Sequence, residues 1–131
     1  MTENGVQRWV DEFTRATNEN EELQAHGKYY SCNFMLDMEE HRFIVRMHEG
    51  KVEEILVDPT DLDARYHFLV RASAETWRNF GQETPPPMYH GIWAASFRRD
   101  MRLEGDLLVM MQNLRTFTRH LELLRVTGVP V

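Results

Sequence analysis

The chain of 131 residues has little of several features that define large classes of proteins. It has one cysteine, Cys32, so it cannot form an internal disulfide bond, and a reducing compartment suits it. It has no apolar run of the length that spans a bilayer, and its first residues lack a basic segment followed by an apolar one. We therefore expect no signal peptide, no stable membrane insertion and a cytoplasmic location.

An excess of basic residues is also missing. There are 15 Lys and Arg against 21 Asp and Glu, which gives a formal net charge of −6. Phosphate contacts from basic side chains supply much of the affinity for nucleic acids, so we expect no nucleic-acid partner. The chain has no Gly-rich phosphate loop, dinucleotide fingerprint or nucleophilic triad, and we expect no cofactor.

The histidines do not have the spacing of a metal site, because none is paired as His-x3-His on one helix, and we expect no metal. His90, which lies beside Tyr89, could be a polar contact for a ligand headgroup or a surface residue, and His67 has the same two interpretations. The full set is His26, His41, His48, His67, His90 and His120.

The first half of the chain predicts one helix followed by strands. Apolar residues at spacings of three and four predict a helix over 4–18. A connector is expected over 23–28. Alternation of apolar and polar residues predicts strands over 30–38, 42–48, 51–57 and 65–72, with turns at 39–40 and 49–50 and a loop over 58–63. We expect these four strands to form an antiparallel meander.

The second half predicts helices around a last strand. Ser73 is expected to cap a helix over 74–80 that ends at Gly81, and Thr84-Pro85 to begin another over 85–97. A short strand over 101–104 leads to Asp106, the expected cap of a long helix that reaches Leu124. The tail over 125–131 should be irregular. The predicted fold is one α+β domain over 1–131, with a mostly antiparallel five-stranded sheet and helices packed on one face.

The long final helix has a wide apolar face that is rich in methionine, which is flexible and adapts to ligands of imprecise shape. Most such faces belong to a protein core, so core packing is the simplest interpretation. Its residues are Leu107, Met110, Met111, Leu114, Phe117, Leu121 and Leu124.

This end of the chain resembles the sterol-carrier-protein type-two-like family of lipid- and sterol-binding domains. The resemblance rests on Leu103-Glu104-Gly105-Asp106, on Met110, Gln112 and Asn113 in the helix that follows, and on the order of elements from about 30 to 124. It implies an apolar tunnel floored by that helix. We therefore expect a ligand cavity between the sheet and the later helices. Its expected lining is Trp77, Phe80, Met88, Tyr89, Ile92, Trp93, Phe97, Met101, Leu103, Met110, Met111, Leu114 and Phe117.

Three functions stay open at this point. The leading one is binding or transfer of a lipid, sterol or other bulky apolar small molecule, released by movement of the helix over 85–97. The second is a small enzyme, of the isomerase, cyclase or hydrolase type, acting on an apolar substrate, with His90, His67 and Asp106 as weak catalytic candidates. The third is an interaction module, for example a homodimer. Arg46 and Arg71 could bind an acid if they point inward, or cover the solvent face of the sheet.

Overall fold

The computed structural model of the protein describes residues 2–60 and 65–131, without the side chains of 97 and 98. The loop predicted over 58–63 therefore lies partly outside the described residues, and the side chain of Phe97 wholly so. The elements are α1 (Glu3–Glu19), α2 (Glu21–His26), β1 (Asn33–Asp37), β2 (Arg42–His48), β3 (Lys51–Val57), β4 (Phe68–Arg71), α3 (Ala74–Phe80), α4 (Ile92–Arg98), β5 (Arg102–Gly105), α5 (Leu107–Gln112), α6 (Leu114–Glu122) and α7 (Leu124–Thr127).

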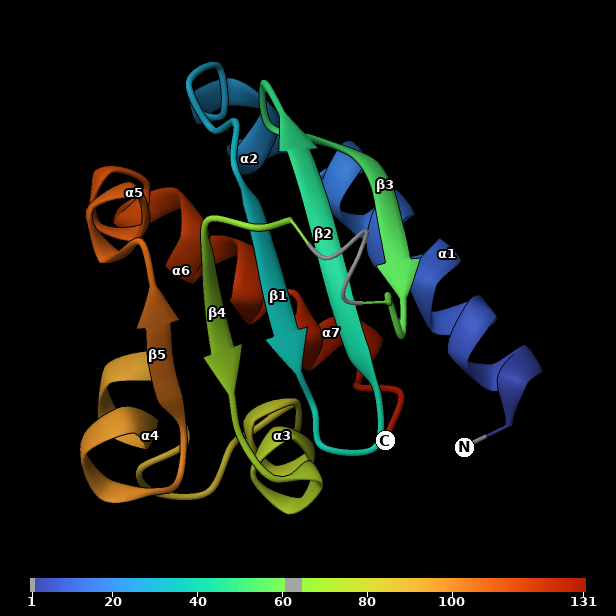
Figure 1. Ribbon diagram of the computed structural model, residues 1–131, viewed down its shortest axis with the longest axis vertical. Helices are drawn as coiled ribbons and strands as arrows, with labels where there is room; N and C mark the ends of the chain where they lie inside the picture. The colour runs from blue at the N-terminus through green and yellow to red at the C-terminus, as the bar shows by residue number, and fades with distance from the viewer. Residues whose placement is uncertain (1, 61–64) are drawn as a thin grey trace.

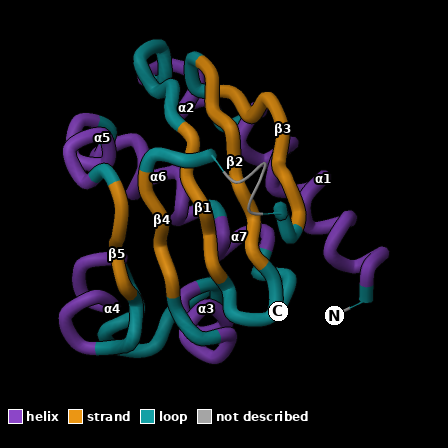
Figure 2. Tube along the Cα trace, viewed as in Figure 1, coloured by secondary structure: helices purple, strands orange, loops and turns teal. Residues whose placement is uncertain are grey.

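The predicted α+β fold with a mostly antiparallel five-stranded sheet is confirmed. The strand order is β3-β2-β1-β4-β5 (Figures 1 and 2). The prediction that the first four strands form an antiparallel meander is wrong for the fourth, because β4 pairs with β1 in parallel. A parallel pair requires the chain to cross over the sheet. β3 therefore lies at one edge of the sheet, and β4 lies on the far side of β2 and β1 from it.

The helices cover one face of this sheet, with α1, α6 and α7 behind the strands in Figure 1. The main core lies between the two layers and includes stacked aromatic rings of Trp9 and Phe13 on α1, 5.1 Å apart. A small second cluster, Met35, Ile44 and Leu69, is buried on the opposite face. In the described part of the chain, no helix has the length and apolar character needed to cross a membrane.

Several local predictions are confirmed almost to the residue. The first helix spans Glu3–Glu19, where 4–18 was expected, and the third strand spans Lys51–Val57. The hydroxyl of Ser73 accepts from the backbone N–H of Thr76 at 3.2 Å, and α3 ends before Gly81. These outcomes follow from short-range physics, since caps and turns involve residues within four positions of one another.

Three predictions in the first half need correction. The connector expected over 23–28 contains the short helix α2, because the side chain of Asn20 accepts from the backbone N–H of Leu23 at 3.0 Å and caps a new helix. Both the first and the fourth strand begin three residues later than expected, at Asn33 rather than 30 and at Phe68 rather than 65.

The helix expected over 85–97 is wrong in its first half, since α4 begins only at Ile92, after Gly91. Three consecutive prolines over 85–87 remove backbone donors, and each disfavours a helical conformation at the residue before it. Met88 follows with a positive φ of 74°. This segment forms turns.

The predicted long final helix is broken into α5, α6 and α7. The first break is at Asn113, whose side-chain N–H donates to the backbone oxygen of Val109 at 2.8 Å. The break rotates the start of the apolar face outward, so that Leu107 is 43% exposed and Met111 is 54% exposed. Beyond the second break, α7 continues to Thr127, inside the tail expected to be irregular.

Candidate functional site

The Gly105-Asp106 turn places α5 beside the start of β4. Gly105 pairs with Phe68 and has φ +98°, and a Cβ added to it would lie 2.8 Å from the backbone oxygen of His67. Asp106 then donates its backbone N–H to that same oxygen at 2.6 Å. Its carboxylate accepts from the backbone N–H of Val109 at 3.2 Å and caps α5. Only glycine allows this close approach of the two strands.

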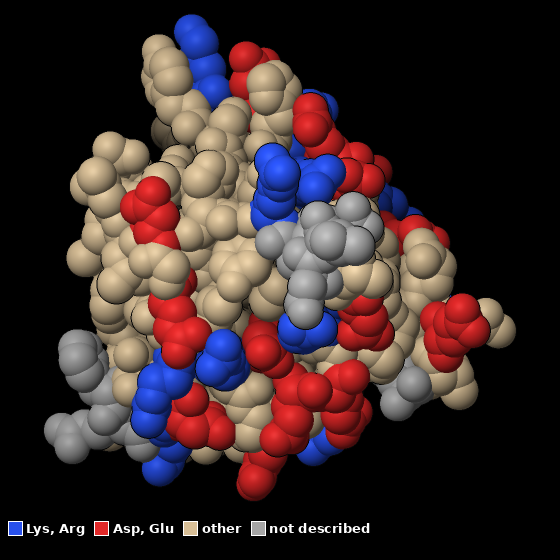
Figure 3. Space-filling view, viewed as in Figure 1, with Lys and Arg blue, Asp and Glu red and all other residues tan. Residues whose placement is uncertain are grey.

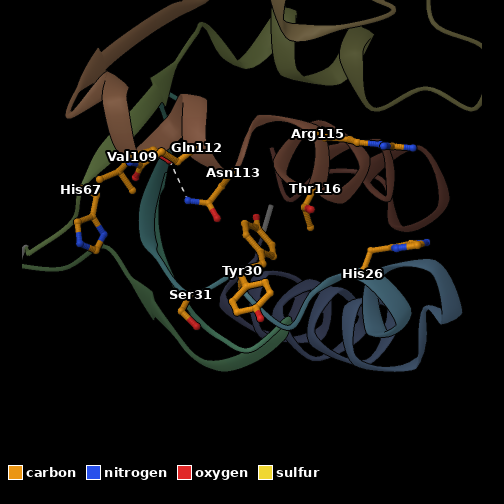
Figure 4. Close-up of a pocket in the computed structure, with 10 residues that line it drawn as sticks. His26, Tyr30, Ser31, His67, Val109, Gln112, Asn113, Arg115 and Thr116 are labelled. Atoms are coloured by element: carbon orange, nitrogen blue, oxygen red, sulfur yellow. Dashed lines mark hydrogen bonds between the residues drawn. The ribbon is translucent and has the colours of Figure 1, made fainter.

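A pocket of about 430 Å³ opens beside α5 and α6 (Figure 4). One wall comes from these two helices, and the other from the end of α2 and the chain that leads into β1. In Figure 4 the side chains of Asn113 and Thr116 point from the helical wall toward Tyr30 and Ser31 on the opposite wall. The lining residues are His26, Tyr29, Tyr30, Ser31, His67, Val109, Gln112, Asn113, Arg115 and Thr116.

Backbone hydrogen bonds fix what two of these side chains can offer a ligand. The hydroxyl oxygen of Ser31 accepts from the backbone N–H of Glu49 at 2.8 Å, so its own proton is free to be donated. Nδ1 of His67 accepts from the backbone N–H of Asn33 at 2.9 Å. The proton of the neutral His67 ring is therefore on Nε2, which is also a donor.

A buried hydrogen-bond network lies behind the Tyr30 wall. The Tyr30 hydroxyl is 2.8 Å from Nδ1 of His120, and Nε2 of His120 is 2.9 Å from the hydroxyl oxygen of Thr17. Thr17 donates its single proton to the backbone oxygen of Phe13 at 2.8 Å. Its oxygen must therefore accept from Nε2, and Nδ1 must accept from Tyr30. The network connects α1, α6 and the pocket wall.

The groups of this region that burial affects most are held uncharged. Burial lowers the pKa of His120 from 6.5 to about 3. Burial, and then the proximity of Cys32, raises the pKa of Tyr30 well above its usual value. Burial raises the pKa of the Cys32 thiol to about 12. Near neutral pH the network thus serves positioning and stability rather than proton transfer.

Six of the thirteen residues of the expected ligand lining are buried in the core. Phe117 packs edge-on against two strand residues, with ring centroids 4.9 Å from Phe34 and 5.0 Å from Phe68. The indole N–H of Trp77 donates to the backbone oxygen of Asp37 at 2.8 Å. The buried members are Trp77, Phe80, Ile92, Met101, Met110 and Phe117; the partly buried ones are Tyr89, Trp93, Leu103 and Leu114; the exposed ones are Met88 and Met111.

None of these residues lines the 430 Å³ pocket, although Met110, Met111 and Leu114 alternate along α5 and α6 with residues that do. Their role in binding stays a prediction. Among the described residues, the structure has no group of three or more His, Cys, Asp or Glu side chains that could hold a metal.

The weak catalytic candidates are not assembled into one site. His67 lines the pocket, Asp106 caps α5, and His90 is exposed and accepts through its backbone oxygen from the guanidinium of Arg125. The two strand arginines have acidic partners. Arg46 bonds Glu54 at 2.6 Å. Arg71 lies 3.5 Å from Asp37 and 3.1 Å from Glu104, so both cover a polar face of the sheet.

Sequence patterns did not point to most of the pocket. His26 and Arg115 are about ninety positions apart and meet only because α2 packs against α6. Two signals were available: His67 was a candidate ligand contact, and the resemblance rested in part on Gln112 and Asn113; all three residues line the pocket. His120 could have been noticed, because it shares a helix face with the buried Phe117 and Leu124.

Comparison with known proteins defines the fold. No protein-family model matches the sequence, and no curated protein matches it. A crystal structure of sterol carrier protein 2 is similar with a TM-score of 0.70, over 90% of this chain and 94% of that one, at 14% identity. A solution structure of a conserved hypothetical protein of Thermus thermophilus, named as a possible sterol carrier protein, has a TM-score of 0.66 at 14% identity and covers 92% and 87%.

A third structure, named as UbiJ-SCP2, a ubiquinone synthesis protein, has a TM-score of 0.56 at 12% identity, over 96% of this chain and 93% of that one. The three likenesses each span nearly the whole chain. The chain therefore has the sterol-carrier-protein-2-like fold, as the order of its elements predicted.

Proposed function

We propose that this protein binds a lipid or another bulky apolar small molecule between α5–α6 and the sheet. The observation that carries the proposal is α5 itself. Of its six residues only Met110 is buried, whereas Leu107, Leu108 and Met111 are 43%, 67% and 54% exposed. In Figure 3 few charged side chains lie over this helix. Exposed apolar patches of this kind mark surfaces that contact something apolar.

The names of the similar structures support the same class of ligand. Two of them name a sterol carrier and the third names ubiquinone synthesis. Sterols and ubiquinone are both bulky and largely apolar. Three residues of the expected lining, Met110, Leu114 and Phe117, belong to α5 and α6 and to the main core cluster or its edge.

Admission of a bulky ligand requires movement, because Phe117 and its two strand partners already fill the space behind α5. α5 is suited to this movement, because it has one buried side chain and ends at the break at Asn113. We therefore assign the moving part to α5 rather than to the segment over 85–97, which is mostly turn. Methionine on both sides of α5 suits a wall that repacks around its ligand.

The proposal also includes the cellular role and location of the protein. We expect the protein to transfer its ligand in the cytoplasm, and its single cysteine, which is free and buried, suits a reducing compartment. Turnover of an apolar substrate in the same pocket, and association of two copies through α5, are the alternative functions.

The test begins with native mass spectrometry of the purified protein, followed by extraction under denaturing conditions. A bound apolar molecule of a few hundred daltons supports the proposal and gives the ligand class. Met111→Asp should weaken binding of a fluorescent lipid by about tenfold or more, since it places a charge against apolar ligand surface. Val126→Asp is the matched control, because Val126 is 81% exposed on α7. Equal effects of both variants, or no uptake of lipid by the wild type, would refute the proposal.

A further inference from the structure

The 430 Å³ pocket is unusual for this acidic chain, because its lining contains an arginine and two histidines and no carboxylate. The basic groups are not evenly spread. Figure 4 shows Arg115 and His26 at the same end of the pocket, with Thr116 between them on the helical wall. The same three residues also line an adjoining hollow of about 30 Å³ between α2 and α6.

The donors at this end have no partners within the described part of the chain. The side chains of His26, Arg115 and Thr116 form no hydrogen bond or ion pair there, whereas Arg119, one turn further along α6, is 3.5 Å from Glu22 and 3.4 Å from Glu122. Glu22 also lines the small hollow, but its carboxylate is engaged by Arg119. Glu22 therefore pairs with Arg119, and the guanidinium of Arg115 stays available to a ligand.

Two other polar side chains of the pocket also offer hydrogen-bond donors to a ligand. The hydroxyl oxygen of Ser31 and Nδ1 of His67 each accept from a backbone N–H group, which leaves the hydroxyl proton of Ser31 and the Nε2 proton of the neutral His67 ring available to a ligand. Arginine with neighbouring hydroxyl and imidazole donors is a combination that recognises a carboxylate or a phosphate. The opposite rim of the pocket is the apolar helix α5.

We propose that His26, Arg115 and Thr116 form a headgroup subsite for an anionic amphipathic ligand. A carboxylate or phosphate lies against these donors, and the apolar part of the same molecule lies against α5. This inference rests on the proposed function for its apolar part and adds the charge and orientation of the ligand.

The test compares two fluorescent probes that differ only in the headgroup, cis-parinaric acid and the corresponding alcohol. The wild type should bind the acid about tenfold or more tightly than the alcohol, and Arg115→Gln should remove this preference without changing the affinity for the alcohol. Arg8→Gln is the control, since Arg8 is exposed on α1 and its loss changes the net charge equally. No preference in the wild type, or equal losses in both variants, overturns the inference.

Inorganic phosphate separates a free anion from a lipid headgroup. If neither probe binds, the proposed function fails, and a phosphate titration followed by the NMR signals of the His26 ring then decides the subsite alone. A saturable shift that Arg115→Gln abolishes supports a free-anion site, and no shift refutes the subsite. If the acid binds and phosphate does not displace it, the headgroup is recognised only together with its apolar chain.

Discussion

The buried His120 should make the stability of this protein fall as the pH is lowered. Its pKa is about 3 in the folded state against 6.5 for the ordinary group, so between these values the unfolded state binds a proton that the folded state does not. The free energy of unfolding therefore rises with pH in this window and is lost as the pH falls. Well below the unfolded-state pKa each pH unit is worth about 1.4 kcal/mol, and because that group is half protonated at pH 6.5 the loss between about pH 6.5 and pH 4.5 is about 2 kcal/mol.

The matched variant is His120→Phe combined with Tyr30→Phe. Replacing His120 alone would leave the Tyr30 hydroxyl buried without its acceptor, whereas the double change removes both polar partners. Phe at 120 keeps an aromatic ring where the imidazole stacks on Phe13, with centroids 5.0 Å apart. Thr17 keeps its bond to the backbone oxygen of Phe13.

The assay is urea unfolding of both proteins from about pH 7.5 to pH 4.5. Burial raises the pKa values of Asp58 and Asp100, but hydrogen bonds outweigh it, so both pKa values are lowered. The bonds come from the Arg42 backbone and His41 to Asp58, and from Thr76 and Ser73 to Asp100. The stabilisation that these carboxylates provide is therefore also lost in acid. Because both proteins contain them, the difference between the two curves isolates His120. The stability of the variant relative to the wild type should rise by about 2–3 kcal/mol toward pH 4.5. Curves that stay parallel within about 0.5 kcal/mol would refute the reasoning.

Three further outcomes follow from the described contacts. Gly105→Ala should destabilise the protein by about 1–3 kcal/mol in urea unfolding, because φ is +98° and the new Cβ would meet backbone at 2.8 Å, whereas Gly91→Ala, with open space around it, should cost less. Thr17→Val should cost about 1–3 kcal/mol by leaving the His120 N–H unpaired, and Thr17→Ser should recover most of this; equal losses would argue against the assigned bond. Cys32 should resist iodoacetamide until the protein unfolds, because its thiol is buried with a pKa of about 12, and fast alkylation of the native protein would contradict this.

The strands and most helix ends could be predicted because their causes are local. Ser73 and Asp106 cap helices through amides three residues away, and alternation of apolar residues placed Phe34 and Leu36 on the buried face of β1. The resemblance predicted the particular fold, because the order of helices and strands is shared with solved structures whose sequences are only 12–14% identical to this one.

Predictions that depended on partners distant in the sequence were less successful. The parallel pairing of β4 with β1 and the break at Asn113 both alter which residues face outward. Neither can be predicted from the spacing of apolar residues along a single segment. The apolar face of the last helix is not buried as one surface, because Leu107 and Met111 are exposed whereas Met110, Phe117, Leu121 and Leu124 are buried.

By itself, the sequence determined the α+β fold, the caps and the residues available for an apolar core, because short-range hydrogen bonds and side-chain periodicity decide these. Only the tertiary structure brought His26 to Arg115 and enclosed His120 between Thr17 and Tyr30. These meetings are between segments about 90 to 103 residues apart. They depend on which helix packs on which strand, and the free energy of that packing belongs to the whole chain rather than to any stretch of it.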